Sequence, residues 1–165
     1  MTSRSTLIAP VRSLLNTLTT PNPISTITST FTTKPAPIAH EYGLPQLAPF
    51  LGHTYTGIDG PEGISVYFGI LVETLDIKSM TFEPESNWLV DDTNMAICLR
   101  GSAKFIWRQT GQWWDETFIY RIVLAKDTSE DDDKRDQYLV SEYKVWADTG
   151  AAYLARTGGL HRESH

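Results

Sequence analysis

The chain has 165 residues, of which 41% are hydrophobic and 21% are charged, a composition typical of one soluble globular domain. Its formal net charge of −6 disfavours binding to nucleic acids and to anionic membranes, because both are bound through an excess of lysine and arginine. The single cysteine excludes an internal disulfide, and no apolar run is long enough to span a bilayer. We therefore expect a cytoplasmic protein with one domain over residues 1–165, a core at about 5–156 and a frayed tail at 157–165.

The N-terminal region predicts two helices. In residues 5–18, apolar side chains recur at spacings of three and four, which is the pattern of an amphipathic helix. Residues 22–31 carry a similar stripe, and Pro23 stands at the first helical position. The serine and threonine content of this second segment also suits a strand.

The next region combines an extended segment, a loop and a third helix. The proline-flanked residues 34–43 are expected to be extended, and residues 44–57 are expected to form a loop. Residues 58–75 show the clearest helical periodicity in the chain. Asp59 and Glu62 have the spacing of a capping pair, so we expect that helix to begin there.

After residue 76 apolar side chains recur at every second position and no longer at every third or fourth, which indicates strands. The breaks between strands fall near residue 93, at Thr110–Gly111 and in the acidic segment 127–136, which we expect to be a solvated loop. Helices followed by a long meander of strands predict an α+β domain with the helices on one face of a curved antiparallel sheet. The predicted strands are 76–92, 94–109, 113–126 and 137–148.

The central hairpin predicts an apolar face that carries one acidic residue. A two-residue turn at Thr110–Gly111 would pair Trp107 with Trp114, and Phe105 with Glu116. Burial of a carboxylate among aromatic rings disfavours its ionised form and raises its pKa, as a general acid or base requires. Alternatively, Glu116 lies near the rim of the sheet and pairs with an arginine or with a tryptophan N–H.

Four segments of the chain carry a resemblance to known proteins. They are HEYG (40–43), GIDGPEGISVYFGIL (57–71), GQWWDETFIY (111–120) and KVWADTGAAYLA (144–155). Together they resemble the nuclear transport factor 2-like superfamily, and more narrowly its SnoaL-like branch of polyketide cyclases and fungal secondary-metabolism isomerases. The resemblance implies a cone-shaped, curved antiparallel sheet that wraps around N-terminal helices and encloses an apolar pocket. It also implies a homodimer formed through the outer sheet faces, and proton transfer by Asp, Glu or His without metal or organic cofactor.

The resemblance suggests two site residues, Asp148 and His40, and the residue types themselves suggest the others. Asp148 matches a recurrent acid/base position near the end of the last long strand, although an aspartate there could instead cap the following helix. His40 matches a pocket-facing position on the first strand. Neighbouring residues on a strand point to opposite faces, so either His40 or Glu41 faces inward, and we expect His40 to do so. Tyr120 could donate a hydrogen bond to a developing enolate. Substrate contacts are expected from Trp107, Trp114, Phe118, Tyr67, Trp146, Trp88, His53 and Tyr55.

These features lead to one main hypothesis and two alternatives. The main hypothesis is a cofactor-independent isomerase, cyclase or dehydratase that acts on a hydrophobic polyketide- or terpenoid-derived intermediate. The first alternative is a module without chemistry that binds a hydrophobic ligand or only presents a surface to a partner. The second is a structural dimer whose cone is filled by side chains. An enzyme should place two ionisable groups within about 6 Å in a pocket, with one pKa shifted. A filled cone should lack a cavity of roughly 300 Å³. The sequence has no His-x-x-x-His motif or cysteine pair, so no metal is expected.

Overall fold

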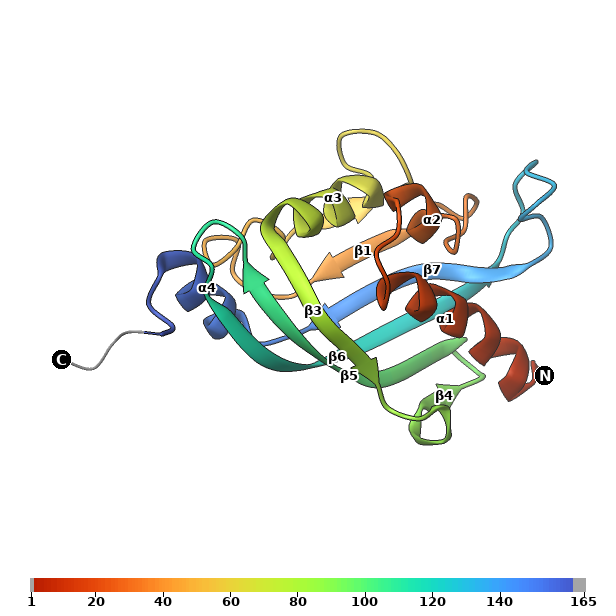
Figure 1. Cartoon of the computed structure of the whole chain (residues 1–165). Helices are drawn as coiled ribbons and strands as arrows, with labels where there is room; N and C mark the ends of the chain where they lie inside the picture. The colour runs from red at the N-terminus through yellow and green to blue at the C-terminus, as the bar shows by residue number, and fades with distance from the viewer. Residues whose placement is uncertain (1, 162–165) are drawn as a thin grey trace.

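The computed structural model describes residues 2–161, which form four α-helices, seven strands and one 3₁₀ turn (Figure 1). None of these helices has the length and hydropathy needed to cross a bilayer. The helices are α1 (Arg4–Leu18), α2 (Ile24–Thr28), α3 (Ile64–Thr74) and α4 (Thr149–Thr157). The strands are β1 (Ile38–Glu41), β2 (Thr54–Thr56), β3 (Leu75–Phe82), β4 (Leu89–Asp91), β5 (Ala96–Trp107), β6 (Trp113–Lys126) and β7 (Tyr138–Trp146), and the 3₁₀ turn is Glu85–Asn87.

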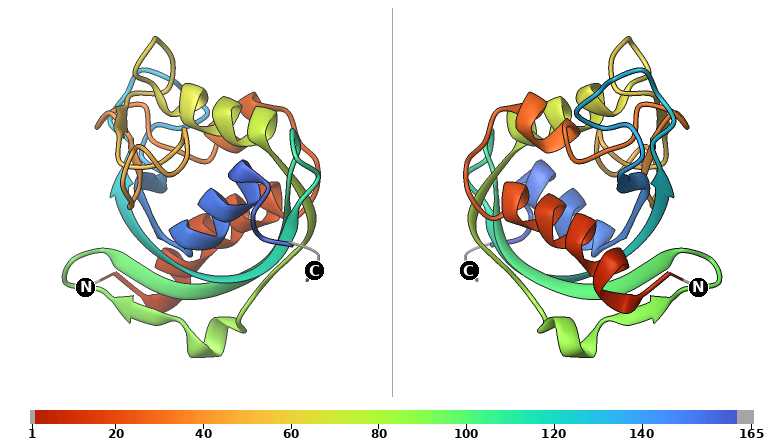
Figure 2. Two further views of the ribbon diagram at one scale, coloured as in Figure 1. Left: turned by 90° about the vertical axis from the view of Figure 1, so that its left-hand side faces the viewer. Right: turned by 90° about the vertical axis from the view of Figure 1, so that its right-hand side faces the viewer.

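The strands form one sheet in the order β2-β1-β7-β6-β5-β3, with β4 paired to β5. End-on views show that the sheet curves strongly and is not closed, with helices lying within the curve (Figure 2). This confirms the expected α+β class. The meander from β5 to β7 is antiparallel, but β1 pairs with β7 in parallel. The expectation of an entirely antiparallel sheet was therefore wrong at β1, because β1 and β7 are joined by most of the chain and not by a hairpin.

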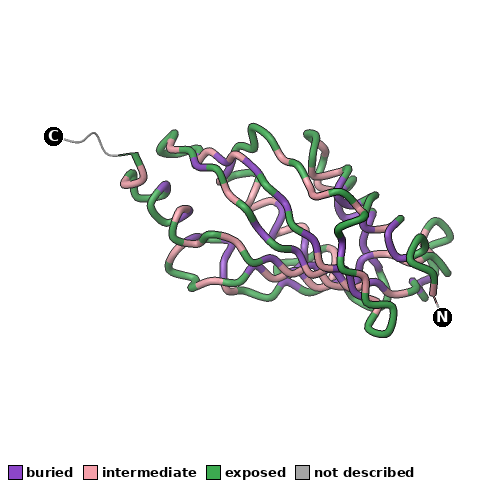
Figure 3. The backbone as a smooth tube through the Cα atoms, turned by 90° about the horizontal axis from the view of Figure 1, so that it is seen from below, coloured by how far each residue is buried: buried purple, intermediate pink, exposed green. Residues whose placement is uncertain are grey.

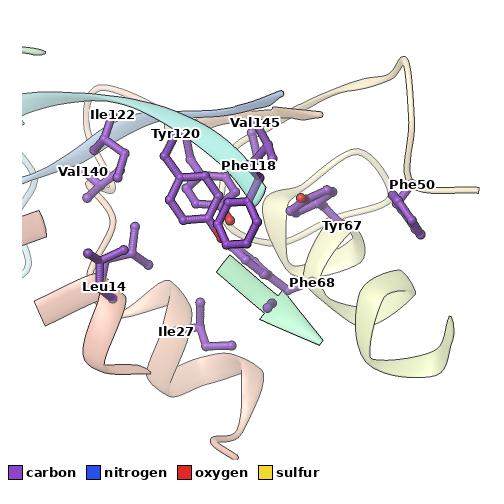
Figure 4. Close-up of a cluster of buried hydrophobic side chains, with 14 of the residues drawn as sticks. Leu14, Ile27, Phe50, Tyr67, Phe68, Phe118, Tyr120, Ile122, Val140 and Val145 are labelled. Carbon is purple, nitrogen blue, oxygen red and sulfur yellow. The ribbon is translucent and has the colours of Figure 1, made fainter. Parts of the chain in front are cut away.

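The core lies between the concave face of the sheet and the helices. Figure 3 shows the buried positions running along the central strands, and Figure 4 shows Leu14 of α1 facing Ile122 and Val140 of the sheet. These three side chains are almost fully buried. The apolar stripe predicted for residues 5–18 is the face of α1 that covers the sheet, and its Leu7 and Val11 are also fully buried.

Helix α3 begins at Ile64, six residues later than the sequence pattern suggested. Its N-cap is Gly63, and neither Asp59 nor Glu62 caps it, so the predicted capping pair was wrong. The Glu62 side chain instead pairs with His53. The segment before the helix is a tight loop in which the Thr56 N–H donates to the Glu62 carbonyl, at 2.6 Å. That turn uses the residues that would otherwise have formed the first helical turn.

The central hairpin differs from its predicted register by two residues. Its turn is longer than two residues, because the Trp107 N–H donates to the Gln112 carbonyl. An even shift keeps every side chain on its predicted face, so the apolar face was predicted correctly. A Cβ on Gly101 would lie 2.3 Å from the Phe118 ring, so only glycine fits this position without rearrangement. The observed partners are Phe105 with Trp114, Ala103 with Glu116, and Gly101 with Phe118.

Two further segments differ from the sequence predictions. The segment 76–92, predicted as one strand, is divided into β3 and β4 by the 3₁₀ turn that follows Pro84. Residues 157–161 were expected to be frayed; in the structure α4 ends at Thr157 with Gly158 as its C-cap, and the Leu160 N–H donates to Gln112 Oε1 at 2.7 Å. Residues 162–165 of the predicted tail lie outside the described residues.

Candidate active site

A cavity of about 340 Å³ lies between the concave face of the sheet, helix α3 and the loop that joins α1 to α2. Its walls are mainly apolar side chains, among them Phe68, Leu71 and Phe105. Figure 4 shows Tyr67, Phe68, Phe118 and Tyr120 converging on this region from a helix and the sheet. The volume lies at the lower end of the range of about 300–1,000 Å³ for small-molecule sites. A cavity of this size excludes the alternative in which the cone is filled by side chains of the protein itself.

Glu41 is the carboxyl group that lines this cavity from its buried wall. Side chains alternate along β1, so Ala39 and Glu41 are buried while Ile38 and His40 are only partly buried. The Tyr67 hydroxyl donates a hydrogen bond to Glu41 Oε1, at 2.7 Å. Burial raises the pKa of Glu41 to about 8; the hydrogen bond from Tyr67 opposes this rise, and the nearby Glu116 adds to it. At neutral pH Glu41 therefore mainly retains its proton.

Three buried tyrosines surround this carboxyl group. Tyr67 comes from α3, Tyr120 from β6 and Tyr143 from β7, and all three line the cavity. The ring centroids of Tyr67 and Tyr143 are 6.1 Å apart, and those of Tyr120 and Tyr143 are 4.9 Å apart. Burial is the largest cause that raises the pKa of each phenol, and the charge of Glu41 adds to it. The phenols therefore stay protonated. The Tyr67 hydroxyl already donates to Glu41, so Tyr120 and Tyr143 are the two that can donate hydrogen bonds to an oxygen in the cavity.

Polar groups of a second kind occur where the cavity meets solvent. Arg108 follows β5 and Asp76 lies in β3, and both are about half exposed. Arg108 Nη2 is 2.9 Å from Asp76 Oδ1. Residues 17–22, at the end of α1 and just after it, also line the cavity, and the exposed residues 19–21 form a further part of its rim. The cavity thus has an acidic, tyrosine-rich interior, apolar walls and a charged pair at its mouth.

Glu116 does not line this cavity, although its pKa is shifted. Its Oε1 accepts hydrogen bonds from the Asp148 backbone N–H at 2.9 Å and from Trp114 Nε1 at 3.4 Å. Burial raises its pKa to about 7, and these two hydrogen bonds oppose the rise. The alternative noted for Glu116, pairing with a tryptophan N–H, is the one that the structure supports.

Asp148 and His40 also lie outside the cavity. Asp148 is exposed, and its Oδ1 accepts a hydrogen bond from the Ala151 N–H at 3.0 Å, so it is the N-cap of α4. His40 Nδ1 lies 2.8 Å from Thr54 Oγ1, and burial is the largest cause that lowers its pKa. The expectation that His40 faces inward was wrong, because its neighbour Glu41 does so.

Of the eight expected substrate contacts, Tyr67 and Phe118 line the cavity. The other six lie elsewhere, because a sequence rich in aromatic residues does not distinguish a cavity wall from filled core or surface. Trp107 packs near Phe50, Trp114 against Phe105, and Tyr55 beside Tyr67; Trp88 is buried and donates to the Glu83 carbonyl; His53 is exposed and pairs with Glu62; Trp146 is exposed and stacks on Tyr42.

Sequence reasoning missed Glu41 and Tyr143. The alternation of residues 38–41 placed either His40 or Glu41 inward, but Ile38 and Ala39 on the two faces are both apolar and did not decide between them. Alternation in the last strand was too weak to place Tyr143. Within residues 2–161, no three His, Cys, Asp or Glu side chains are grouped as a metal site would require.

Comparison with known proteins gives matches in structure but not in sequence. No family model and no curated protein matches the chain. An NTF2-like protein from Burkholderia xenovorans has a TM-score of 0.62 at 11% identity, covering 93% of this chain and 97% of its own. A ketosteroid isomerase-like protein from Erwinia carotovora has a TM-score of 0.57 at 16% identity, covering 87% and 95%. The BvnE pinacolase from Penicillium brevicompactum has a TM-score of 0.57 at 12% identity, covering 94% and 93%. At these identities the likeness concerns the fold, and the chain has the NTF2-like fold, which several isomerase-like proteins share.

Proposed function

We propose that this protein is a cofactor-independent isomerase, cyclase or dehydratase that acts by proton transfer on a hydrophobic polyketide- or terpenoid-derived molecule. One observation carries the proposal: Glu41, a buried carboxyl group with a pKa raised to about 8, lines an apolar cavity beside Tyr67. A proton donor with a pKa near the working pH is what general acid catalysis requires. A purely structural core would not favour such a group, since burying a carboxyl group is costly.

The chemistry follows from the protonation state of Glu41. The neutral acid gives its proton to an oxygen or an alkene carbon of the substrate. The resulting carboxylate then accepts a proton from a neighbouring carbon, and the electron pair of the broken C–H bond forms a double bond. The net change is an isomerisation. If the protonated oxygen leaves as water the product is a dehydrated molecule, and if a carbon–carbon bond forms before the second transfer the product is a ring.

The tyrosines and the apolar walls would assist both transfers. Tyr67 donates to Glu41 and stabilises its carboxylate once the proton has left. Tyr120 and Tyr143 line the same cavity and could donate to an oxygen on which negative charge develops. The surrounding aromatic and aliphatic side chains keep water away from a reactive intermediate.

Two arguments favour catalysis over simple ligand binding. Glu41 and Tyr67 are two ionisable groups 2.7 Å apart in one cavity, and the pKa of Glu41 is shifted toward neutrality. A carrier for apolar ligands has no need of such a group, because dispersed polar side chains are enough to orient its ligand. The isomerase-like and pinacolase neighbours share the fold at low identity and agree with this choice.

The test uses deuterium exchange, which needs no knowledge of the natural substrate. Hydrophobic ketones such as androstenedione are incubated with the protein in D₂O, and deuterium uptake beside the carbonyl is measured by mass spectrometry. Glu41→Gln should lower the rate by about 100-fold or more, whereas Asp148→Asn, outside the cavity, should not. If Glu41 acts as the acid, the rate falls about tenfold per pH unit above about pH 8. Ketones that bind without any exchange would support the non-catalytic alternative.

The proposal includes a homodimer that forms through the outer face of the sheet. Ile119 and Trp146 are paired on adjacent strands of that face, with 42% and 41% of their surfaces exposed. Exposed apolar side chains of this size are common at interfaces between subunits. Light scattering coupled to size-exclusion chromatography should give a dimer mass for the wild type and a monomer mass for Ile119→Asp. A monomeric wild type would contradict this part of the proposal.

A further inference from the structure

Arg108 is the one lysine or arginine among the residues that line the cavity, and three contacts hold it at the mouth. Its backbone N–H donates to the Thr74 carbonyl at 2.9 Å, and its Nε donates to the Leu75 carbonyl at 3.4 Å. Its Nη2 is 2.9 Å from Asp76 Oδ1. The two side-chain contacts orient the guanidinium before a ligand arrives, so part of the cost of ordering a long side chain is already met.

Three other polar side chains of the rim, Thr17, Thr19 and Asn22, direct their donors elsewhere. The hydroxyl of Thr17 donates to the Leu14 carbonyl at 2.6 Å, and that of Thr19 donates to the Asn16 carbonyl at 3.2 Å. The amide of Asn22 donates to backbone carbonyls of the same loop, at 3.0 Å. A guanidinium carries five N–H donors, and the contacts described above occupy only part of this set. Arg108 is therefore the group at the mouth best able to donate to a ligand oxygen.

Asp76 restricts which oxygen that can be. A ligand carboxylate at the guanidinium would lie close to the Asp76 carboxylate, and the two like charges would repel each other. A neutral carbonyl oxygen accepts the same hydrogen bond without this repulsion. The pair of Arg108 and Asp76 carries no net charge, which agrees with the apolar character of the cavity walls.

We propose that Arg108 is a specificity residue that binds a neutral carbonyl oxygen at the end of the substrate remote from the reacting carbon. The substrate class is then an apolar compound with a ketone, ester or lactone carbonyl at the cavity mouth. Its reacting end lies against Glu41 and the tyrosines, and this assignment of the two ends rests on the function proposed above. Apolar walls between the two polar regions match a hydrophobic middle section of the ligand.

Binding is measured by titration calorimetry on the unreacted probes androstenedione, a decalin dione, and the keto-acid in which a carboxylate replaces one androstenedione carbonyl. Arg108→Met should weaken binding of the diketones by about tenfold. Arg100→Met, at an exposed position of β5, the strand that precedes Arg108, is the matched control and should leave affinity unchanged. Asp76→Asn should change the affinity for the diketones by no more than about twofold, but it should raise the affinity for the keto-acid by about fivefold or more. In the double variant, Arg108→Met should remove this gain in keto-acid affinity.

Several outcomes would overturn this assignment. These are diketone affinities that are equal in Arg108→Met and Arg100→Met, keto-acid binding that does not respond to Asp76→Asn, and a wild type that binds none of the probes. Failure of the proposed catalysis is a separate result, because binding requires no turnover. If the wild type shows no deuterium exchange but Arg108→Met still weakens diketone binding, the role of Arg108 stands and the catalytic role of Glu41 falls. Exchange in the wild type with no effect of Arg108→Met gives the reverse conclusion.

Discussion

Replacing Glu41 by glutamine should change how the stability of the protein depends on pH. The folded protein holds the Glu41 proton up to a pKa of about 8, whereas the unfolded chain releases it near 4.5. Between these values the folded state binds more protons than the unfolded state, so raising the pH favours unfolding. Glutamine has nearly the same shape and no proton to lose. Glu41→Gln therefore becomes progressively more stable than the wild type as the pH rises, and the difference levels off above about pH 8.

The magnitude follows from the width of this interval. Each pH unit within it changes the difference in unfolding free energy by about 1.4 kcal/mol, which accumulates to roughly 5 kcal/mol over the whole interval. Between about pH 5.5 and about pH 7.5 the expected change in the free energy of unfolding is roughly 2 to 3 kcal/mol. With a urea slope of about 2 kcal/mol per M, the two urea midpoints should separate by a further 1 M or more over that range.

The assay is urea unfolding followed by tryptophan fluorescence at several pH values. Glu116, whose pKa is about 7, is present in both proteins, so its own titration largely cancels from the comparison. Glu73→Gln, at an exposed position of α3, is a matched control and should follow the wild type at every pH. A difference between Glu41→Gln and the wild type that does not vary from pH 5 to pH 9 would refute the reasoning. It would mean that Glu41 ionises as freely in the folded protein as in water.

Three further substitutions test the geometry. Tyr67→Phe removes the hydroxyl that donates to Glu41 and should lower the free energy of unfolding by about 1 to 3 kcal/mol. The loss should be larger at pH 9 than at pH 6, because the hydrogen bond is stronger to the ionised carboxylate. A loss that does not vary with pH in urea unfolding would argue against this hydrogen bond. Asp148→Ala removes the cap of α4 and should lower the free energy of unfolding by about 1 kcal/mol and the Tm by about 2 to 4 °C, whereas Asp148→Asn should retain the cap. Loss of deuterium exchange in a stable Asp148→Asn protein would restore a catalytic role for Asp148. Gly101→Ala should destabilise by about 1 to 3 kcal/mol, since its methyl group meets the Phe118 ring, and an unchanged Tm would show that the ring yields freely.

Local periodicity was enough to predict most helices and strands, because each depends on residues close together in the sequence. Residues 5–18 and 113–126 follow this rule and form α1 and β6 as expected. The face of the central hairpin was also predictable, although its register was not. The length of the turn sets which residues of the two strands face each other. The observed register differs from the predicted one by two residues, and such a shift leaves Glu116 and its neighbours on the same face of the sheet.

The site was harder to predict because its members come from distant parts of the chain. Whether His40 or Glu41 faces inward depends on how β1 pairs with β7, about a hundred residues later, and no local pattern encodes that pairing. The alternative reading of Asp148 as a cap was visible in the sequence, since Asp-Thr-Gly-Ala-Ala suits a strand-to-helix turn. Among the aromatic residues, composition predicted an apolar interior but not which rings border empty space.

The parallel pairing of β1 with β7 has a consequence for the order in which the protein can assemble during synthesis. Glu41 lies opposite Val145, so β1 cannot dock on β7 until the ribosome has released that strand, about a hundred residues later. Contacts so far apart in sequence form late, after the local hairpins. A nascent or truncated chain without its last strand could hold the β5–β6 hairpin, yet it would leave Glu41 in water with an ordinary acidity. Glu41 thus reaches its buried position, with its raised pKa, only after β7 has been synthesised.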